Sequence, residues 1–190
     1  IGERPYFGNQ QPIEDMVSMT VGEMLTNIIW CRIGSLHRIN SVANWMWPST
    51  DKGDGNLLLK AVNHLTQLSK QLGFSINGGK DSLSMTVSRE QEKVKAPATL
   101  TLSGYSSIID TQSIKTPNLK SADSLILLVR LGKFRGSMLG SAYSRFYETN
   151  SKPTRWTEID NFKIIWYIMQ GLIQHRMIIS GHDISDGGLL

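Results

Sequence analysis

Three stretches of the chain carry apolar residues at spacings of three and four, the pattern of a helix with one buried face. They cover residues 13–30, 58–72 and 159–173. Gly73 follows the second stretch directly, and glycine is the residue that most often ends a helix. The sequence therefore predicts three amphipathic helices.

Shorter runs between these stretches have the patterns of β-strands. Polar and apolar residues alternate over residues 82–87 and 99–102, as in strands with one buried face, and residues 88–93 form their predicted hairpin connection. Continuous apolar runs at residues 124–129 and 177–179 predict buried strands. Helices and strands together indicate a mixed α/β (α+β) protein.

Two polar stretches divide the chain. Residues 77–81 contain paired glycines and interrupt a strand that starts at Phe74, so we predict a strand–loop–strand arrangement there. Residues 116–123 have the composition of a linker. We therefore predict one unit over residues 1–118 and the beginning of a second over residues 119–190.

Composition narrows the class of partner. The formal charge is +4 over 190 residues, and no run of five basic residues occurs, which argues against nucleic acid. Phosphate-bearing small molecules explain the same bias. No apolar run approaches the roughly eighteen residues of a membrane span. The single cysteine, Cys31, lies in the apolar pattern of the first predicted helix and cannot form an internal disulfide, so we expect a protein of the reducing cytoplasm.

The residues around Lys80 are the first candidate site. Gly78 and Gly79 would let backbone N–H groups approach an anion, with Lys80 supplying positive charge. The spacing is not that of a Walker A loop, because Asp81 follows the lysine. A glycine-rich turn with a solvated lysine explains the same residues.

A second candidate lies at residues 181–188, Gly-His-Asp-Ile-Ser-Asp-Gly-Gly, directly after a predicted buried strand. Ligands in α/β folds often bind where strands end, and Asp183, Ser185 and Asp186 could hold a hard cation and a phosphate. A serine hydrolase using Ser185 is an alternative, although Asp183 replaces the first glycine of the nucleophile elbow. An ordinary Asp-rich turn is another.

Glu23 and Asn27 form the third candidate. They stand four residues apart on the first predicted helix, so their side chains lie one above the other. A carboxylate and an amide oxygen in this arrangement can both reach one Mg²⁺ ion. Such pairs are also common on ordinary helix surfaces.

Taken in order, these segments resemble phosphoribosylformylglycinamidine synthase of the long, single-chain type. Gly-Gly-Lys-Asp-Ser-Leu-Ser-Met at residues 78–85 and Ser-Gly-His-Asp-Ile-Ser-Asp-Gly-Gly-Leu at residues 180–189 are the longest. The others are residues 1–5, 21–27, 41–47, 96–97 and 116–120. Each is weak evidence, but the ordered set spans the chain and is specific.

The resemblance implies a fold and a reaction. The synthetase region of this family has two halves, each similar to aminoimidazole ribonucleotide synthetase, with an N-type domain followed by a C-type domain. This chain resembles the N-type domain of the second half and the start of its C-type partner. The family reaction activates the amide of formylglycinamide ribonucleotide with ATP and replaces its oxygen with ammonia from glutamine.

The resemblance also implies ligands. Glu23, Asn27 and Asp183 match family positions that bind Mg²⁺, and Ser185 matches one that contacts the nucleotide, ATP or ADP; Gly78, Gly79 and Lys80 are further nucleotide-binding candidates. A fourth metal ligand, an aspartate, is expected before Ile1. The chain begins without Met and stops in a glycine turn, so we expect an internal piece, inactive without the first synthetase half and the glutaminase. A non-catalytic relative of the viral tegument type is the alternative.

Overall fold

A four-stranded sheet forms the centre of the computed structural model, which describes residues 1–131, 137–147, 151–185 and 188. Its strands lie in the order β1–β6–β2–β3. Neighbouring strands are antiparallel except for the parallel pair β2–β3. The strand bounds are β1 Gly2–Pro5, β2 Asn40–Met46, β3 Ser75–Ser82 and β6 Thr99–Tyr105.

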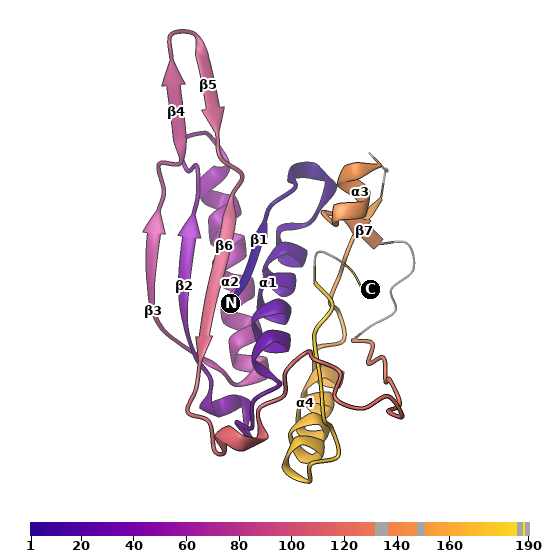
Figure 1. Ribbon diagram of the computed structural model, residues 1–190. Helices are drawn as coiled ribbons and strands as arrows, with labels where there is room; N and C mark the ends of the chain where they lie inside the picture. The colour runs from indigo at the N-terminus through magenta and orange to yellow at the C-terminus, as the bar shows by residue number, and fades with distance from the viewer. Residues whose placement is uncertain (132–136, 148–150, 186–187, 189–190) are drawn as a thin grey trace.

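Two helices cover one face of this sheet, as Figure 1 shows. They are α1, Ile13–Ile28, and α2, Asp54–Leu72. Helix α1 buries its apolar stripe against β1 and β6. The negative charges of Glu14 and Asp15 in its first turn interact favourably with the positive end of the helix dipole. Gly73 ends α2 with a positive φ of 91°, a conformation that glycine adopts without strain. Both predicted helices are confirmed.

The two faces of the sheet differ in burial. On β2, residues Ser41, Ala43 and Trp45 are buried on the helix side, while the alternate positions point to the other side. Val42 on that other side is 39% exposed. Figure 1 shows no helix over this face in the described part of the chain.

Helix α4, Ile159–Gln174, packs on the same hydrophobic core as α1 and α2. Its Gln170 side chain is buried and accepts hydrogen bonds from the N–H groups of Ile33 and Gly34, both at 2.8 Å. The amide of Gln170 donates to the carbonyls of Ile29 at 2.8 Å and Cys31 at 3.1 Å. One side chain therefore fixes the segment after α1 to α4. The division at residues 118 and 119 remains a prediction.

A hairpin of β4, Thr86–Arg89, and β5, Glu92–Lys95, extends beyond the end of the sheet. Lys95 pairs with Asp51 at 3.0 Å and with Asp54 at 2.7 Å, and Lys93 also pairs with Asp51. These pairs join the base of the hairpin to the start of α2. The predicted connection at residues 88–93 is thus itself part of a two-stranded hairpin.

The remaining described elements are short. They are β7 Ser137–Leu139, β8 Lys152–Pro153, α3 Ala142–Phe146 and the 3₁₀ helices Gly8–Gln10, Leu36–Arg38 and Thr111–Ser113. Across the described ranges, no helix combines the length and the apolar character needed to cross a membrane.

Five predictions about local structure are wrong. The strand predicted over residues 82–87 is interrupted, because β3 ends at Ser82 and β4 begins at Thr86. Residues 77–81 are not a loop, because they lie inside β3. The apolar runs at residues 124–129 and 177–179 form no strand, and Leu125 is 92% exposed. A strand requires a hydrogen-bonded neighbour, and no described segment pairs with either run. Cys31 lies beyond the end of α1 rather than within it.

Candidate functional site

Glu23 lies on the half of α1 that packs beside β1, and its side chain is 21% exposed. Its Oε2 atom lies 3.1 Å from Nε of Arg4 and accepts a hydrogen bond of 3.3 Å from the backbone N–H of Glu3. The neighbouring strand therefore holds the carboxylate in one place. A carboxylate fixed in this way can bind a cation without first losing side-chain freedom.

Asn27 lies one turn further along α1. Its Nδ2 atom donates to the backbone carbonyls of Ile1 and Glu23, both at 3.0 Å. Because both amide protons are used, the orientation of the amide is fixed, and its Oδ1 atom has no partner in the described part of the chain. An amide oxygen held in this way is a suitable ligand for Mg²⁺.

The segment that carries Asp183 follows α4 (Figure 1) and reaches the residues just beyond the end of α1. The N–H of Gly181 donates to the carbonyl of Thr116 at 3.1 Å, and the N–H of Lys115 donates to the carbonyl of Trp30 at 3.0 Å. Gly181 also packs directly against the indole ring of Trp30. The segment around Gly181 therefore meets the segment that follows α1 at Trp30, three residues after Asn27.

Asp183 is largely buried, with a side chain 9% exposed. Its Oδ1 atom lies 3.1 Å from Nδ1 of His182, which is itself exposed. Ser185 is exposed and forms an isolated bridge with Gly188. Asp186 and Gly187 of the same motif lie outside the described residues.

The oxygen atoms of Glu23, Asn27 and Asp183 have the chemistry that Mg²⁺ prefers. Among the residues that the structure describes, no group of three or more His, Cys, Asp and Glu side chains is placed to hold a metal ion. The predicted set contributes only two carboxylates, and its third ligand is an amide. Glu23 and Asn27 lie one turn apart on α1, and whether Asp183 joins them around one ion remains a prediction.

Lys80, Gly78 and Gly79 lie elsewhere. They belong to β3, at the opposite edge of the sheet from the strand that contacts Glu23. Lys80 pairs in register with Asn44 of β2, so it lies on the face away from α1 and α2. Its Nζ atom contacts Oγ of Ser82 at 3.1 Å. In this chain, Lys80 and the α1 pair do not form one site.

The close packing of β3 against β2 explains why glycine occupies position 79. A Cβ atom at position 79 would lie 2.7 Å from the carbonyl oxygen of Ala43, so only glycine allows the strands to approach this closely. Neither Gly78 nor Gly79 has a positive φ. The predicted loop is therefore wrong, because these residues are extended in β3. Nucleotide binding by Gly78, Gly79 and Lys80 remains a prediction.

Comparison with known proteins gives the same family along the whole chain. The family model described as the FGAR-AT PurM_N-like domain matches residues 1–107. The phosphoribosylformylglycinamidine synthase of Dictyostelium discoideum is 37% identical over 200 residues, which cover 100% of this chain and 14% of that protein.

Relatives from other eukaryotes agree. The probable phosphoribosylformylglycinamidine synthase, chloroplastic/mitochondrial, of Arabidopsis thaliana is 35% identical over 193 residues, covering 100% of this chain and 14% of the relative. The phosphoribosylformylglycinamidine synthase of Homo sapiens is 32% identical over 190 residues, covering 95% and 14%. The chain thus spans about one seventh of the length of these curated relatives.

Proposed function

The chain belongs to the phosphoribosylformylglycinamidine synthase family, and from this premise we propose that it is one part of an ATP-dependent amidotransferase of purine biosynthesis. The enzyme would convert formylglycinamide ribonucleotide, glutamine and ATP into formylglycinamidine ribonucleotide. Its other parts would be the first synthetase half and a glutaminase of the same polypeptide. Its location would be the cytoplasm.

Within that enzyme, this chain contributes half of a nucleotide–Mg²⁺ site, which is auxiliary rather than the site of turnover. The observation that supports it is the packing of Gly181 on Trp30, because it brings the segment of Asp183 to the helix that carries Glu23 and Asn27. When bound, Mg²⁺ would neutralise phosphate charge and orient the nucleotide. Ser185 would contact the nucleotide.

Arg4 has a positioning role in this proposal. Its guanidinium group holds one oxygen of Glu23 at 3.1 Å, and α1 and β1 hold the backbone on either side. The carboxylate is therefore oriented before a cation arrives. An arginine also lowers the net negative charge of the site, which would favour an incoming nucleotide over a free cation.

The chain itself has no glutaminase centre in this proposal. Burial raises the pKa of the Cys31 thiol, so less of it is the reactive thiolate near neutral pH. The carbonyl of Cys31 also serves the structural hydrogen bond from Gln170. The test measures glutamate release from glutamine by the intact protein and by its Cys31→Ala variant. Loss of glutamate release in Cys31→Ala would contradict this assignment.

The hydrolase alternative lacks the neighbouring base that serine nucleophiles require. In the described residues, the hydroxyl of Ser185 has no histidine partner, and Nδ1 of His182 contacts Asp183 instead. Absence of labelling by a serine-reactive fluorophosphonate is the expected result.

The test of the half-site uses nucleotide retained by the intact protein. The purified protein is denatured, and the released ATP and ADP are measured by chromatography after washing with Mg²⁺ or with EDTA. Glu23→Gln and Asp183→Asn should each lower the Mg²⁺-dependent nucleotide, whereas Asp123→Asn, an exposed aspartate, should not. Unchanged retention in both site variants would reject the half-site. Product formation is measured in the same preparations. If the site is auxiliary, the variants keep their synthase activity. If the protein is a non-catalytic binding protein of the tegument type, neither the parent nor the variants form product.

A further inference from the structure

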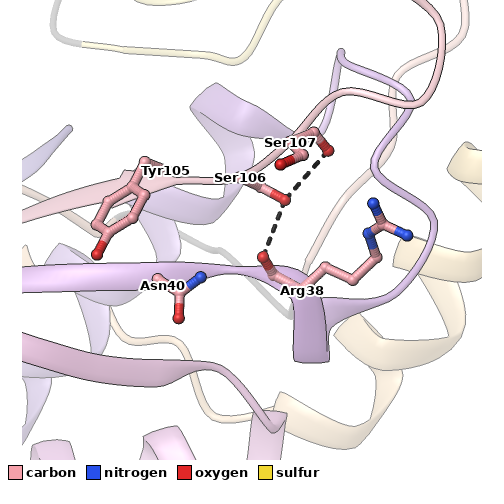
Figure 2. Close-up of a pocket in the computed structure, with 5 residues that line it drawn as sticks. All are labelled: Arg38, Asn40, Tyr105, Ser106 and Ser107. Carbon is pink, nitrogen blue, oxygen red and sulfur yellow. Dashed lines mark hydrogen bonds between the residues drawn. The ribbon is translucent and has the colours of Figure 1, made fainter.

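A hollow lies on the face of the sheet away from α1, where β2 begins and β6 ends. It has a volume of about 480 Å³ and is lined by Arg38, Asn40, Tyr105, Ser106 and Ser107 (Figure 2). Pockets that bind small molecules typically measure roughly 300–1,000 Å³. The size therefore allows a ligand of several tens of atoms or fewer.

The position of the hollow follows from strand register. Asn40, the first residue of β2, stands directly opposite Tyr105, the last residue of β6. Their neighbours Ser41 and Gly104 face the helices: Ser41 is buried, and a Cβ atom at position 104 would lie 2.9 Å from the Met24 side chain. Because side chains alternate, Asn40 and Tyr105 open onto the face away from α1. Glu23 and Asn27 on α1 are separated from them by the sheet.

Arg38 provides the charge. It ends the 3₁₀ helix Leu36–Arg38 and is exposed, and its guanidinium group makes no hydrogen bond or ion pair within the described residues. The backbone beside it is fixed, since Ser106 Oγ donates to the carbonyl of Arg38 at 2.9 Å (Figure 2). None of the lining residues is acidic. An unpaired guanidinium in such surroundings is suited to bidentate binding of a phosphate.

Asn40 and Tyr105 could orient a ligand in the hollow. The Oδ1 atom of Asn40 accepts from Nδ2 of Asn77 at 2.7 Å, which leaves its own Nδ2 as a donor toward the hollow. The hydroxyl of Ser107 is a further donor in the lining. Tyr105 is 49% exposed, and its ring pairs with no other aromatic ring of the described chain. An exposed aromatic face beside a cation suits a planar ring attached to a phosphate.

We propose that this hollow binds an organic phosphate with a planar ring, of the nucleoside monophosphate class, with Arg38 on the phosphate and Tyr105 stacked on the ring. The site is separate from the half-site and requires no metal, because its charge is supplied by an arginine. It does not depend on the proposed synthase reaction.

The experiment measures binding of AMP, ribose 5-phosphate and adenosine to the intact protein by calorimetry in EDTA. EDTA silences a Mg²⁺-dependent site, and Asp183→Asn provides a second check that the signal does not come from there. AMP should bind more tightly than either probe. Arg38→Gln should weaken AMP and ribose 5-phosphate about tenfold or more, as expected for loss of a charged hydrogen bond. Tyr105→Ala should weaken AMP roughly fivefold or more and leave ribose 5-phosphate unchanged.

Arg89→Gln is the matched control, since Arg89 is an exposed arginine on the hairpin and should not affect binding. Arg38 and Tyr105 are both exposed, so their variants should keep the melting temperature of the parent. The proposal is overturned if AMP does not bind in EDTA, or if Arg38→Gln binds AMP as the parent does. Loss of the signal in Asp183→Asn would assign the binding to the half-site instead.

Discussion

Gly181 packs against the indole ring of Trp30, and a methyl group at position 181 would overlap that ring. Trp30 follows the end of α1, and Gly181 stands two residues before Asp183. The contact is therefore a direct link between the helix that carries Glu23 and Asn27 and the segment that carries Asp183. Because the overlap involves a large ring whose neighbour Ile29 is buried, it cannot be relieved by turning a flexible side-chain end.

This contact predicts the effect of Gly181→Ala. Forcing an extra methyl into a packed position typically costs about 1–3 kcal/mol, and the displaced segment should also lower Mg²⁺-dependent nucleotide retention. Gly171→Ala is the control, because no atom lies within 4 Å of the added Cβ in α4; it should raise stability by up to about 1 kcal/mol. Urea unfolding measures both changes. Equal stability of the two variants would show that the contact is not tight.

Gln170 predicts a larger effect. Gln170→Leu would leave the N–H groups of Ile33 and Gly34 and the carbonyl of Ile29 without their buried partner. Unsatisfied buried groups are expensive, so the loss should be about 2–4 kcal/mol in urea unfolding. Gln67→Leu, an exposed glutamine on α2, should change stability by less than about 0.5 kcal/mol. Similar values for the two variants would mean that solvent replaces the lost bonds.

The helices could be predicted from the sequence because each carries an apolar stripe that the fold buries. The strand at residues 99–102 could be predicted for the same reason, since Leu100 and Leu102 of β6 are fully buried. Residues 77–81 contain glycine, asparagine and aspartate, all unfavourable in strands. They form β3 because β2 offers a parallel partner and Gly79 permits close approach. That pairing is tertiary and leaves no periodic signal.

The site was predicted in part. The spacing of Glu23 and Asn27 correctly placed both on one helix, because helical geometry fixes that relationship. Their partners are Arg4 of β1 and Ile1, the residue before that strand, and the antiparallel pairing of β1 with β6 places both beside α1. The bonds of Gln170 could not be predicted either, since one glutamine in an amphipathic helix has no distinguishing pattern. Residues 124–129 show the converse, an apolar run that no described segment covers.

His64 predicts a dependence of stability on pH. Its Nε2 atom lies 2.8 Å from Oγ of the buried Ser18, between α2 and α1. Burial lowers the pKa of His64 below its usual 6.5, while the charges of Glu14 and Asp15 oppose this shift. The unfolded chain therefore binds a proton near pH 6.5 and the folded chain only at lower pH. The contribution to stability is present above pH 6.5 and is lost as the pH falls toward the folded value.

The measurement is urea unfolding between pH 7.5 and 5. In the parent, the free energy of unfolding should decrease as the pH is lowered. In His64→Gln, this decrease should be smaller. His175→Gln, at the exposed end of α4, should keep the slope of the parent. An unchanged slope in His64→Gln would assign the pH dependence to other groups.

Lys80 provides the last prediction, because it separates a ligand contact from a structural role. Its side chain is exposed, and in the described residues its hydrogen bond is to Ser82. Replacing it with methionine keeps the length of the side chain and removes the charge. Without nucleotide, Lys80→Met should change stability by less than about 0.5 kcal/mol. If the ammonium group contacts phosphate in the intact protein, the same change should weaken nucleotide retention severalfold.

Lys60→Met is the control, since Lys60 is exposed on α2, on the opposite side of the sheet. It should alter neither property. Thermal unfolding with and without ATP gives the comparison in one experiment: a ligand that binds only the folded state raises the melting temperature, and that increase should shrink in Lys80→Met alone. If the melting temperature of Lys80→Met falls equally with and without ATP, the lysine stabilises β3 and makes no phosphate contact. The glycines beside it would then have only the role that Gly79 already has, which is to let β3 lie close to β2.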